Sequence, residues 1–149
     1  MIKYSVNQDL YPGTVVAHEV NGNHCIFKTD NKVLLKIEAK TPYIIRFRFT
    51  TDGYFQEDFS YAIDPDFENT SVDLNIVDKG GFFLVKTKQV TVQLSKEDLK
   101  MKICDAKGQL LCEDEKGFHW EKHPRLGGNI VKMTKQIQEA EHFYGLGDK

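Results

Sequence analysis

Apolar side chains recur at every second position along most of this chain. In the clearest run, Ile45, Phe47 and Phe49 alternate with Arg46 and Arg48. Alternation of this kind predicts a β-strand that buries one face and exposes the other. Comparable runs lie near 33–38, 83–87 and 90–94. Counting such runs gives about ten or more short strands, at the spacing typical of a β-sandwich.

The phase of the alternation reverses within one stretch of the chain. Phe83 and Val85 place the apolar residues at odd positions, whereas Val92 and Leu94 place them at even positions. A shift of one residue turns every side chain of a strand to the opposite face. We therefore expect a bulge, a corner or a switch between sheets at 87–89.

Turn-forming residues separate the runs, and little of the sequence favours helix. The segment 132–141 lacks a sustained apolar stripe, so we expect a strand over 129–138. The four prolines fall at presumed strand ends or loops, where a missing amide donor does no harm. The pattern predicts one all-β domain over 1–149, built as an antiparallel sandwich. The turn signals are Asn21-Gly22-Asn23, Asp30-Asn31-Lys32, Asp52-Gly53, Lys79-Gly80-Gly81, Lys107-Gly108 and Gly127-Gly128.

Composition narrows the class of protein without naming a function. The chain has 149 residues and a formal charge of −2, with lysines and acids interspersed. This distribution gives no basic field for nucleic acid or an anionic membrane. No apolar run approaches the ~20 residues of a membrane-spanning helix. Met1-Ile2-Lys3-Tyr4 lacks the apolar region of a signal peptide, so we expect a cytoplasmic protein.

The three cysteines, Cys25, Cys104 and Cys112, do not form a disulfide framework in this interpretation. A hairpin turn at 105–108 would place Cys104 opposite Leu110 and Cys112 opposite Lys102. The two cysteines would then be diagonal neighbours about 7–8 Å apart, too far for an easy bridge. We expect all three thiols to be reduced.

Three acidic clusters could in principle supply the paired carboxylates of a glycosidase: Asp64-Pro65-Asp66, Glu57-Asp58 and Glu113-Asp114-Glu115. We place all of them in solvated loops or turns, without the burial that raises a carboxyl pKa. No catalytic residue is therefore assigned.

The histidines give no metal or cofactor site in this interpretation. His119 and His123 have helical spacing for a metal, but Gly117 and Pro124 argue against a helix and no third ligand is visible. His18, His24 and His142 are isolated, and no cofactor is expected. Gly145-Leu146-Gly147 resembles the start of a nucleotide-binding loop, but it lacks the required strand–loop–helix context. Asn69-Thr70-Ser71 matches a glycosylation pattern, which has meaning only in a secreted protein.

Six aromatic residues could stack on sugar rings as they do in carbohydrate-binding modules: Tyr54, Phe55, Phe59, Tyr61, Phe118 and Trp120. Packing in a core or between domains is the favoured role, because aromatic side chains supply much of the buried area in such cores. Tyr54 and Phe55 follow Asp52-Gly53 and could lie at a loop tip.

Several blocks, taken in order, resemble one known family. They are Val33–Glu38 with Ile44–Phe49, Phe59–Ile63, Leu84–Thr87 with Val90–Val92, Ile103–Leu111, and the tail Phe143-Tyr144-Gly145-Leu146-Gly147-Asp148. Together they resemble the N-terminal module of glycoside hydrolase family 31, which contains α-glucosidases and α-xylosidases. The blocks span roughly 25–149. Asp148 stands where many members have glutamate.

The resemblance implies a galactose-mutarotase-like super-sandwich with little or no helix. It also implies that this is one domain of a longer chain, whose catalytic aspartates belong to a separate (β/α)8 barrel. The module would pack on that barrel and wall its active site, and carbohydrate substrate would bind only in the full-length protein. No catalytic, cofactor-binding or metal-binding residue is therefore assigned, and the substrate-binding residues are unknown. The alternatives are a stand-alone carbohydrate-binding module and a mutarotase-like epimerase.

Overall fold

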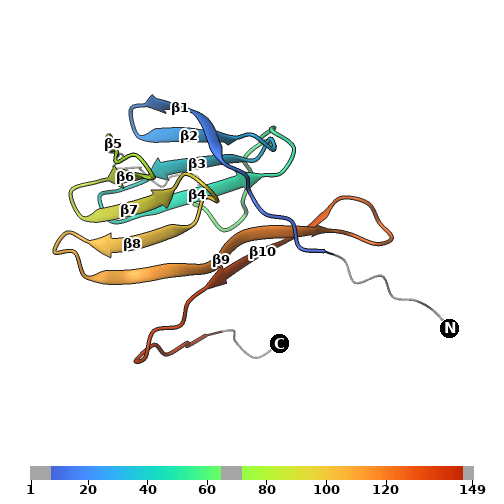
Figure 1. Cartoon of the computed structure of the whole chain (residues 1–149). Helices are drawn as coiled ribbons and strands as arrows, with labels where there is room; N and C mark the ends of the chain where they lie inside the picture. The colour runs from blue at the N-terminus through green and yellow to red at the C-terminus, as the bar shows by residue number, and fades with distance from the viewer. Residues whose placement is uncertain (1–7, 65–71, 146–149) are drawn as a thin grey trace.

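The computed structural model describes residues 8–64 and 72–145, and these form two antiparallel β-sheets. No helix occurs among them, and hence none that could cross a membrane. The prediction of an all-β sandwich is confirmed (Figure 1). The strands are β1 Val15–Asn21, β2 His24–Thr29, β3 Leu34–Ala39, β4 Ile45–Thr50, β5 Asn75–Asp78, β6 Phe82–Lys86, β7 Val90–Ser95, β8 Met101–Asp105, β9 Leu110–Lys122 and β10 Asn129–Lys135.

Each sheet is a meander in which strands that follow one another along the chain pair side by side. The first sheet has the order β1-β2-β3-β4, and the second has the order β10-β9-β8-β7-β6-β5. The alternation in the sequence decides which residues lie between the sheets. Leu35 and Ile37 of β3, and Val92 and Leu94 of β7, are completely buried. Strand β10 was expected to reach 138, but it ends at Lys135.

At 87–89 the chain reverses direction in a hairpin within one sheet, so the prediction of a bulge, a corner or a switch between sheets was wrong. Strands β6 and β7 pair in a tight hairpin, with Val85 opposite Val92 and Phe83 opposite Leu94. Residues opposite each other share a face, and a two-residue loop pairs odd positions with even ones. The Thr87 hydroxyl supports the turn, because it accepts the amide of Val90 at 3.0 Å and donates to the Pro42 carbonyl at 2.7 Å.

A bulge between Ile103 and Cys104 makes the strand register around the cysteines differ from the predicted one. Cys104 does lie opposite Leu110, but Cys112 pairs with Ile103 and not with Lys102. The bulge adds one residue to β9, which shifts all later pairs by one. Because adjacent residues of a strand face opposite sides, Cys104 and Cys112 point to different faces of the sheet. Both thiols and that of Cys25 are free.

The N-terminal segment completes the edge of β9 that β8 does not reach. Leu10 and Trp120 exchange backbone hydrogen bonds of 2.7 and 3.0 Å, so a segment near the start of the chain lies beside the end of β9 (Figure 1). On the outer face, the Tyr11 ring stacks on His119 with ring centroids 5.5 Å apart. Asp9 pairs with Lys132 of β10 at 2.8 Å. The segment therefore fastens the start of the chain to its last two strands.

Candidate functional site

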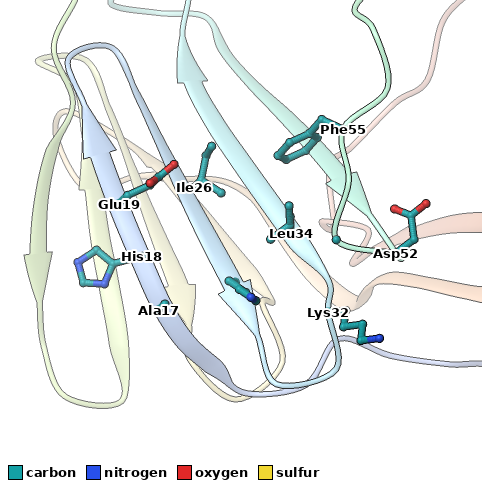
Figure 2. Close-up of a pocket in the computed structure, with 10 residues that line it drawn as sticks. Ala17, His18, Glu19, Ile26, Lys32, Leu34, Asp52 and Phe55 are labelled. Atoms are coloured by element: carbon teal, nitrogen blue, oxygen red, sulfur yellow. The ribbon is translucent and has the colours of Figure 1, made fainter.

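A groove of about 640 Å³ lies on the outer face of the four-stranded sheet. Ile26 and Leu34 form its floor, and Phe55 from the loop after β4 forms a wall. Figure 2 shows these three side chains on one side of the sheet with Glu19, whereas His18 lies on the other side. The groove thus combines an apolar floor with charged side chains at its rim, including the carboxylates of Glu19 and Asp52.

A charge cluster holds the loop after β4 against this outer face. Arg46 and Arg48 project from β4 and contact the Asp58 carboxylate, Arg46 through two hydrogen bonds. The hydrogen bond from Arg46 is the main reason that the pKa of Asp58 falls to about 2. Asp58 is therefore ionised throughout the neutral range and cannot act as a general acid there. Of the pair Glu57-Asp58, one carboxylate is occupied in holding the loop.

The cluster Glu113-Asp114-Glu115 was predicted to be a solvated turn, and this was wrong. It lies within β9, and only 1% of the Asp114 side chain is exposed. Asp114 accepts the Met101 amide at 2.9 Å and forms an ion pair with Lys135. The nearby Gly117 has a φ of +67° and leaves room for this carboxylate, since a Cβ there would lie 2.9 Å from it. A glycine inside a strand was the available sequence signal for this irregularity.

The third acidic cluster and two other predicted features fall partly or wholly outside the described residues. Asp64 is exposed, whereas Pro65 and Asp66 are outside. The glycosylation pattern at 69–71 and the end of the glycine-rich tail at 146–149 are also outside.

The structure does not bring the two spaced histidines together as ligands. His119 is buried, and its Nδ1 donates to the Gly117 carbonyl at 2.9 Å. The His123 ring accepts the backbone amides of Arg125 and Leu126 in the loop before β10. Among residues 8–64 and 72–145, no three His, Cys, Asp or Glu side chains cluster in a way that could hold a metal.

The remaining histidines and two of the cysteines, Cys25 and Cys112, have surroundings that indicate a structural role and not a reactive one. The exposed His18 ring packs against Phe27 and Phe83, with ring centroids 5.9 and 4.8 Å away. His24 neighbours Asn23, and His142 lies near Tyr144. Burial raises the pKa of Cys25 to about 12, which leaves its thiol protonated and unreactive at neutral pH. Burial also raises the pKa of Cys112.

The aromatic residues divide into a buried set and an exposed set. Phe118 and Trp120 belong to the core, as predicted. Tyr54 and Tyr61 are 65% and 96% exposed, and Phe59 packs edge-to-face on Tyr61 with ring centroids 4.6 Å apart. Exposed rings of this kind suit contact with either another protein surface or a sugar ring.

A second exposed apolar region lies along β10 and the tail beyond it. We call it the C-terminal apolar face. Its side chains are between 37% and 91% exposed, which makes them too numerous and too close in sequence to be scattered surface residues. Exposed apolar side chains this frequent in one segment indicate an interaction surface. It comprises Leu126, Ile130, Val131, Met133, Ile137, Phe143 and Tyr144.

Comparison with known proteins gives one family. The family model described as the glycosyl hydrolase 31 N-terminal galactose mutarotase-like domain matches residues 34–149. No match was found among curated protein sequences.

Solved structures share the fold at low sequence identity. One is a variant of the GH31 dextranase of Flavobacterium johnsoniae complexed with isomaltotriose, with a TM-score of 0.78, 23% identity and coverage of 94% of this chain and 17% of that chain. The GH31 α-xylosidase of Xanthomonas citri has a TM-score of 0.59 and 20% identity, over 90% of this chain and 14% of that one. The cycloalternan-forming enzyme of Listeria monocytogenes has a TM-score of 0.62 and 15% identity, over 78% and 11%. The chain thus spans less than a fifth of the length of each.

Proposed function

Because the chain belongs to the family of glycosyl hydrolase 31 N-terminal galactose mutarotase-like domains, we propose that it is the non-catalytic N-terminal module of a longer retaining glycoside hydrolase of the α-glucosidase type. The match of the family model over 34–149 carries this proposal. In such a protein, a separate (β/α)8 barrel supplies the catalytic carboxylates. The module packs on the barrel and forms one wall of its active site.

The C-terminal apolar face is the surface we assign to this packing. Ile137, Phe143 and Tyr144 present exposed apolar side chains along the segment that follows β10. Contacts between domains of one chain cover about 600–1,500 Å² and combine apolar with polar groups. Lys132 and Lys135 alternate with the apolar residues but are occupied by Asp9 and Asp114. The apolar side chains therefore remain available for a partner.

The state of the carboxylates supports a non-catalytic role. A retaining glycosidase needs two carboxyl groups about 5–5.5 Å apart on either side of the glycosidic bond. Asp58 is held by arginines, and Asp114 is buried against Met101 and Lys135. Both carboxylates are thus engaged in contacts within the module.

We expect the purified 149-residue chain to show no turnover of nitrophenyl α-glucoside or α-xyloside between about pH 4 and 8, the range in which tuned carboxylates work. The measurement is release of nitrophenol, with the parent enzyme that carries the barrel as the positive control. Turnover that disappears in Asp58→Asn or Asp114→Asn would contradict the proposal, because it would place the reaction on this module.

A stand-alone carbohydrate-binding module is the second candidate, and the exposed aromatic rings favour it. Tyr54 borders a small cleft beside Phe55, and Phe55 also walls the groove on the outer face. Rings that stack on sugars must be accessible, and the half-buried Phe55 has the Arg48 guanidinium 5.3 Å from its ring centroid. No comparable observation on the described residues favours a mutarotase-like epimerase.

We expect the module to bind maltose and isomaltose oligomers no tighter than millimolar, a binding free energy weaker than about −4 kcal/mol. Its rings serve the core and the interface with the barrel in the proposed function. Calorimetric titration decides between the two candidates. Micromolar binding that is lost in Tyr54→Ala or Phe55→Ala, but kept in the control Tyr144→Ala, would replace the structural module with the binding module.

A further inference from the structure

The two sheets differ in width, and this leaves β10 without a strand opposite it. Phe27 of β2 contacts Phe83 of β6 with ring centroids 5.0 Å apart, and Phe49 of β4 stacks on Phe118 of β9 at 4.2 Å. Strand β4, the last of its sheet, therefore lies over β9, and β10 extends beyond it.

The side chains of β10 that point toward the other sheet are exposed for this reason. Val131 pairs with Trp120 and Met133 pairs with Phe118, so each shares the inward face of a core residue. Trp120 and Phe118 are 6% and 8% exposed, whereas Val131 and Met133 are 64% and 44% exposed. Inward-facing apolar residues of a sandwich are normally covered by the opposite sheet. The inner face of β10 is thus an open flank of the core.

The free edge of β4 borders the same opening. Ala39 donates its amide to Asn23 beside β2, so the pair Ala39–Ile45 is of the type without mutual hydrogen bonds. By alternation, Ile45, Phe47 and Phe49 direct their amides and carbonyls away from β3. Among the described residues, no strand pairs with β4 on that side. The side chains of these three residues are only half-buried, whereas those of Leu35 and Ile37 in β3 are fully buried.

A cleft of about 230 Å³ lies between the end of β4 and β10, lined by Phe49, Tyr54, Phe118 and Val131. Asn129 donates to Thr51 at 2.6 Å and holds β4 and β10 together at one end of it. Nearby, the buried Thr50 Oγ1 and Asn129 Oδ1 have no hydrogen-bond partner among the described residues. Buried polar atoms without partners are rare in native proteins.

We propose that an extended segment of the parent polypeptide, outside residues 1–149, pairs with β4 as a fifth strand of this sheet and covers the inner face of β10. The proposal rests on the proposed function, because it requires a longer chain. Neighbouring strands lie about 4.8 Å apart, so one added strand brings the sheet over β10. The free amides and carbonyls of β4 supply the main-chain bonds, and Val131 and Met133 receive apolar side chains at alternate positions of the new strand.

Charge on the outer face of β4 argues against a second copy of this chain as the occupant. Arg46 and Arg48 lie on that face and share the single carboxylate of Asp58. Antiparallel pairing of two β4 strands would bring the arginines of both copies together, and like charges on opposite strands are destabilising. The added strand should therefore carry acidic or neutral polar residues on its outer face.

Hydrogen exchange at peptides covering 44–50 tests this proposal. In the 149-residue chain, the amides of Ile45, Phe47 and Phe49 should exchange quickly, and those of Arg46, Arg48 and Thr50 slowly. In the parent protein all six should exchange slowly, with the first three slowed about tenfold or more. Peptides covering β3 are the control, because its amides are bonded to β2 and β4 in both proteins.

Three outcomes overturn the proposal: fast exchange of the three amides in both proteins, slow exchange in the monomeric 149-residue chain, or slow exchange that appears only as this chain associates with itself. The last outcome would identify a second copy as the occupant. Slow exchange only in a parent that lacks glycoside hydrolase activity would instead reject the proposed function and keep the fifth strand.

A variant on the opposite wall gives an independent check. Val131→Lys should leave the melting temperature of the 149-residue chain nearly unchanged, because Val131 is 64% exposed there. In the parent it should speed exchange of the three β4 amides about tenfold, since a lysine cannot be covered in an apolar contact at low cost. Val16→Lys, at a 60% exposed position of β1, is the matched control and should have no such effect. Equal behaviour of the two variants in the parent would contradict the fifth strand.

Discussion

Replacing Phe118 with alanine is expected to lower the free energy of unfolding by about 3–5 kcal/mol, the usual cost of removing a large aromatic side chain from a core. Phe118 stacks on Phe49 of the other sheet at 4.2 Å and on Trp120 of its own strand at 5.7 Å. It is therefore the main contact between the sheets at the β4–β9 side. The loss would open this flank further, because no described strand lies beyond β4 to close over the cavity.

Urea unfolding followed by Trp120 fluorescence measures this change, since Trp120 is the only tryptophan. Tyr61→Ala is the matched control. Tyr61 is 96% exposed and contacts Phe59 at its edge, so its removal should change the free energy of unfolding by no more than about 0.5 kcal/mol. A cost below about 1 kcal/mol for Phe118→Ala would show that this side of the sandwich is not part of the cooperative core.

Asp114→Ala is expected to lower the free energy of unfolding by about 2–4 kcal/mol. The substitution removes the acceptor for the Met101 amide and the partner of Lys135 at a side chain that is only 1% exposed. The Met101 amide then remains buried without a hydrogen bond, which supplies most of the cost. Lys135 is 37% exposed and regains water, which keeps the value below that of a fully buried pair.

Two further variants separate the contributions at this site. Asp114→Asn keeps an acceptor for the Met101 amide and should lose less than Asp114→Ala. Asp98→Ala removes a carboxylate that lies 3.5 Å from Lys100 on the surface, and it should cost no more than about 1 kcal/mol. Thermal or urea unfolding compares the three proteins. Equal losses for Asp114→Ala and Asp98→Ala would contradict a buried structural role for Asp114.

The sequence predicts the faces of the strands correctly because burial repeats with the same period as the pleat. Leu35, Ile37, Val85 and Val92 are all buried as the alternation requires. The sequence located the reversal of phase at 87–89 correctly, but the structure there is a hairpin and not the predicted bulge, corner or switch between sheets. A hairpin and a bulge both change the parity of the buried positions, and parity alone does not distinguish them. The hairpin is stabilised by hydrogen bonds of the Thr87 hydroxyl to Val90 and to the distant Pro42, which the parity does not reveal.

Local irregularities and long-range contacts limited the prediction of the site. The bulge between Ile103 and Cys104 changes the partner of Cys112, and its position depends on how β8 and β9 pair. Asp114 reads as solvated in the sequence, because its acceptor role depends on Met101 and Lys135 from two other strands. The open flank at β4 and β10 depends on the relative widths of two sheets. No single segment of the sequence encodes that difference.

The pairing of Leu10 with Trp120 also sets a time order for folding. Roughly 110 residues separate the two partners, so closing this contact requires ordering nearly the whole chain, and long-range pairing of this kind is slow. On a ribosome that adds about 5–20 residues per second, the start of the chain waits several seconds or more for β9 to emerge. The four-stranded meander, whose strands are all neighbours in sequence, can pair during that interval. The N-terminal segment can therefore pair only after β9 has been synthesised, when the first sheet has already had time to form.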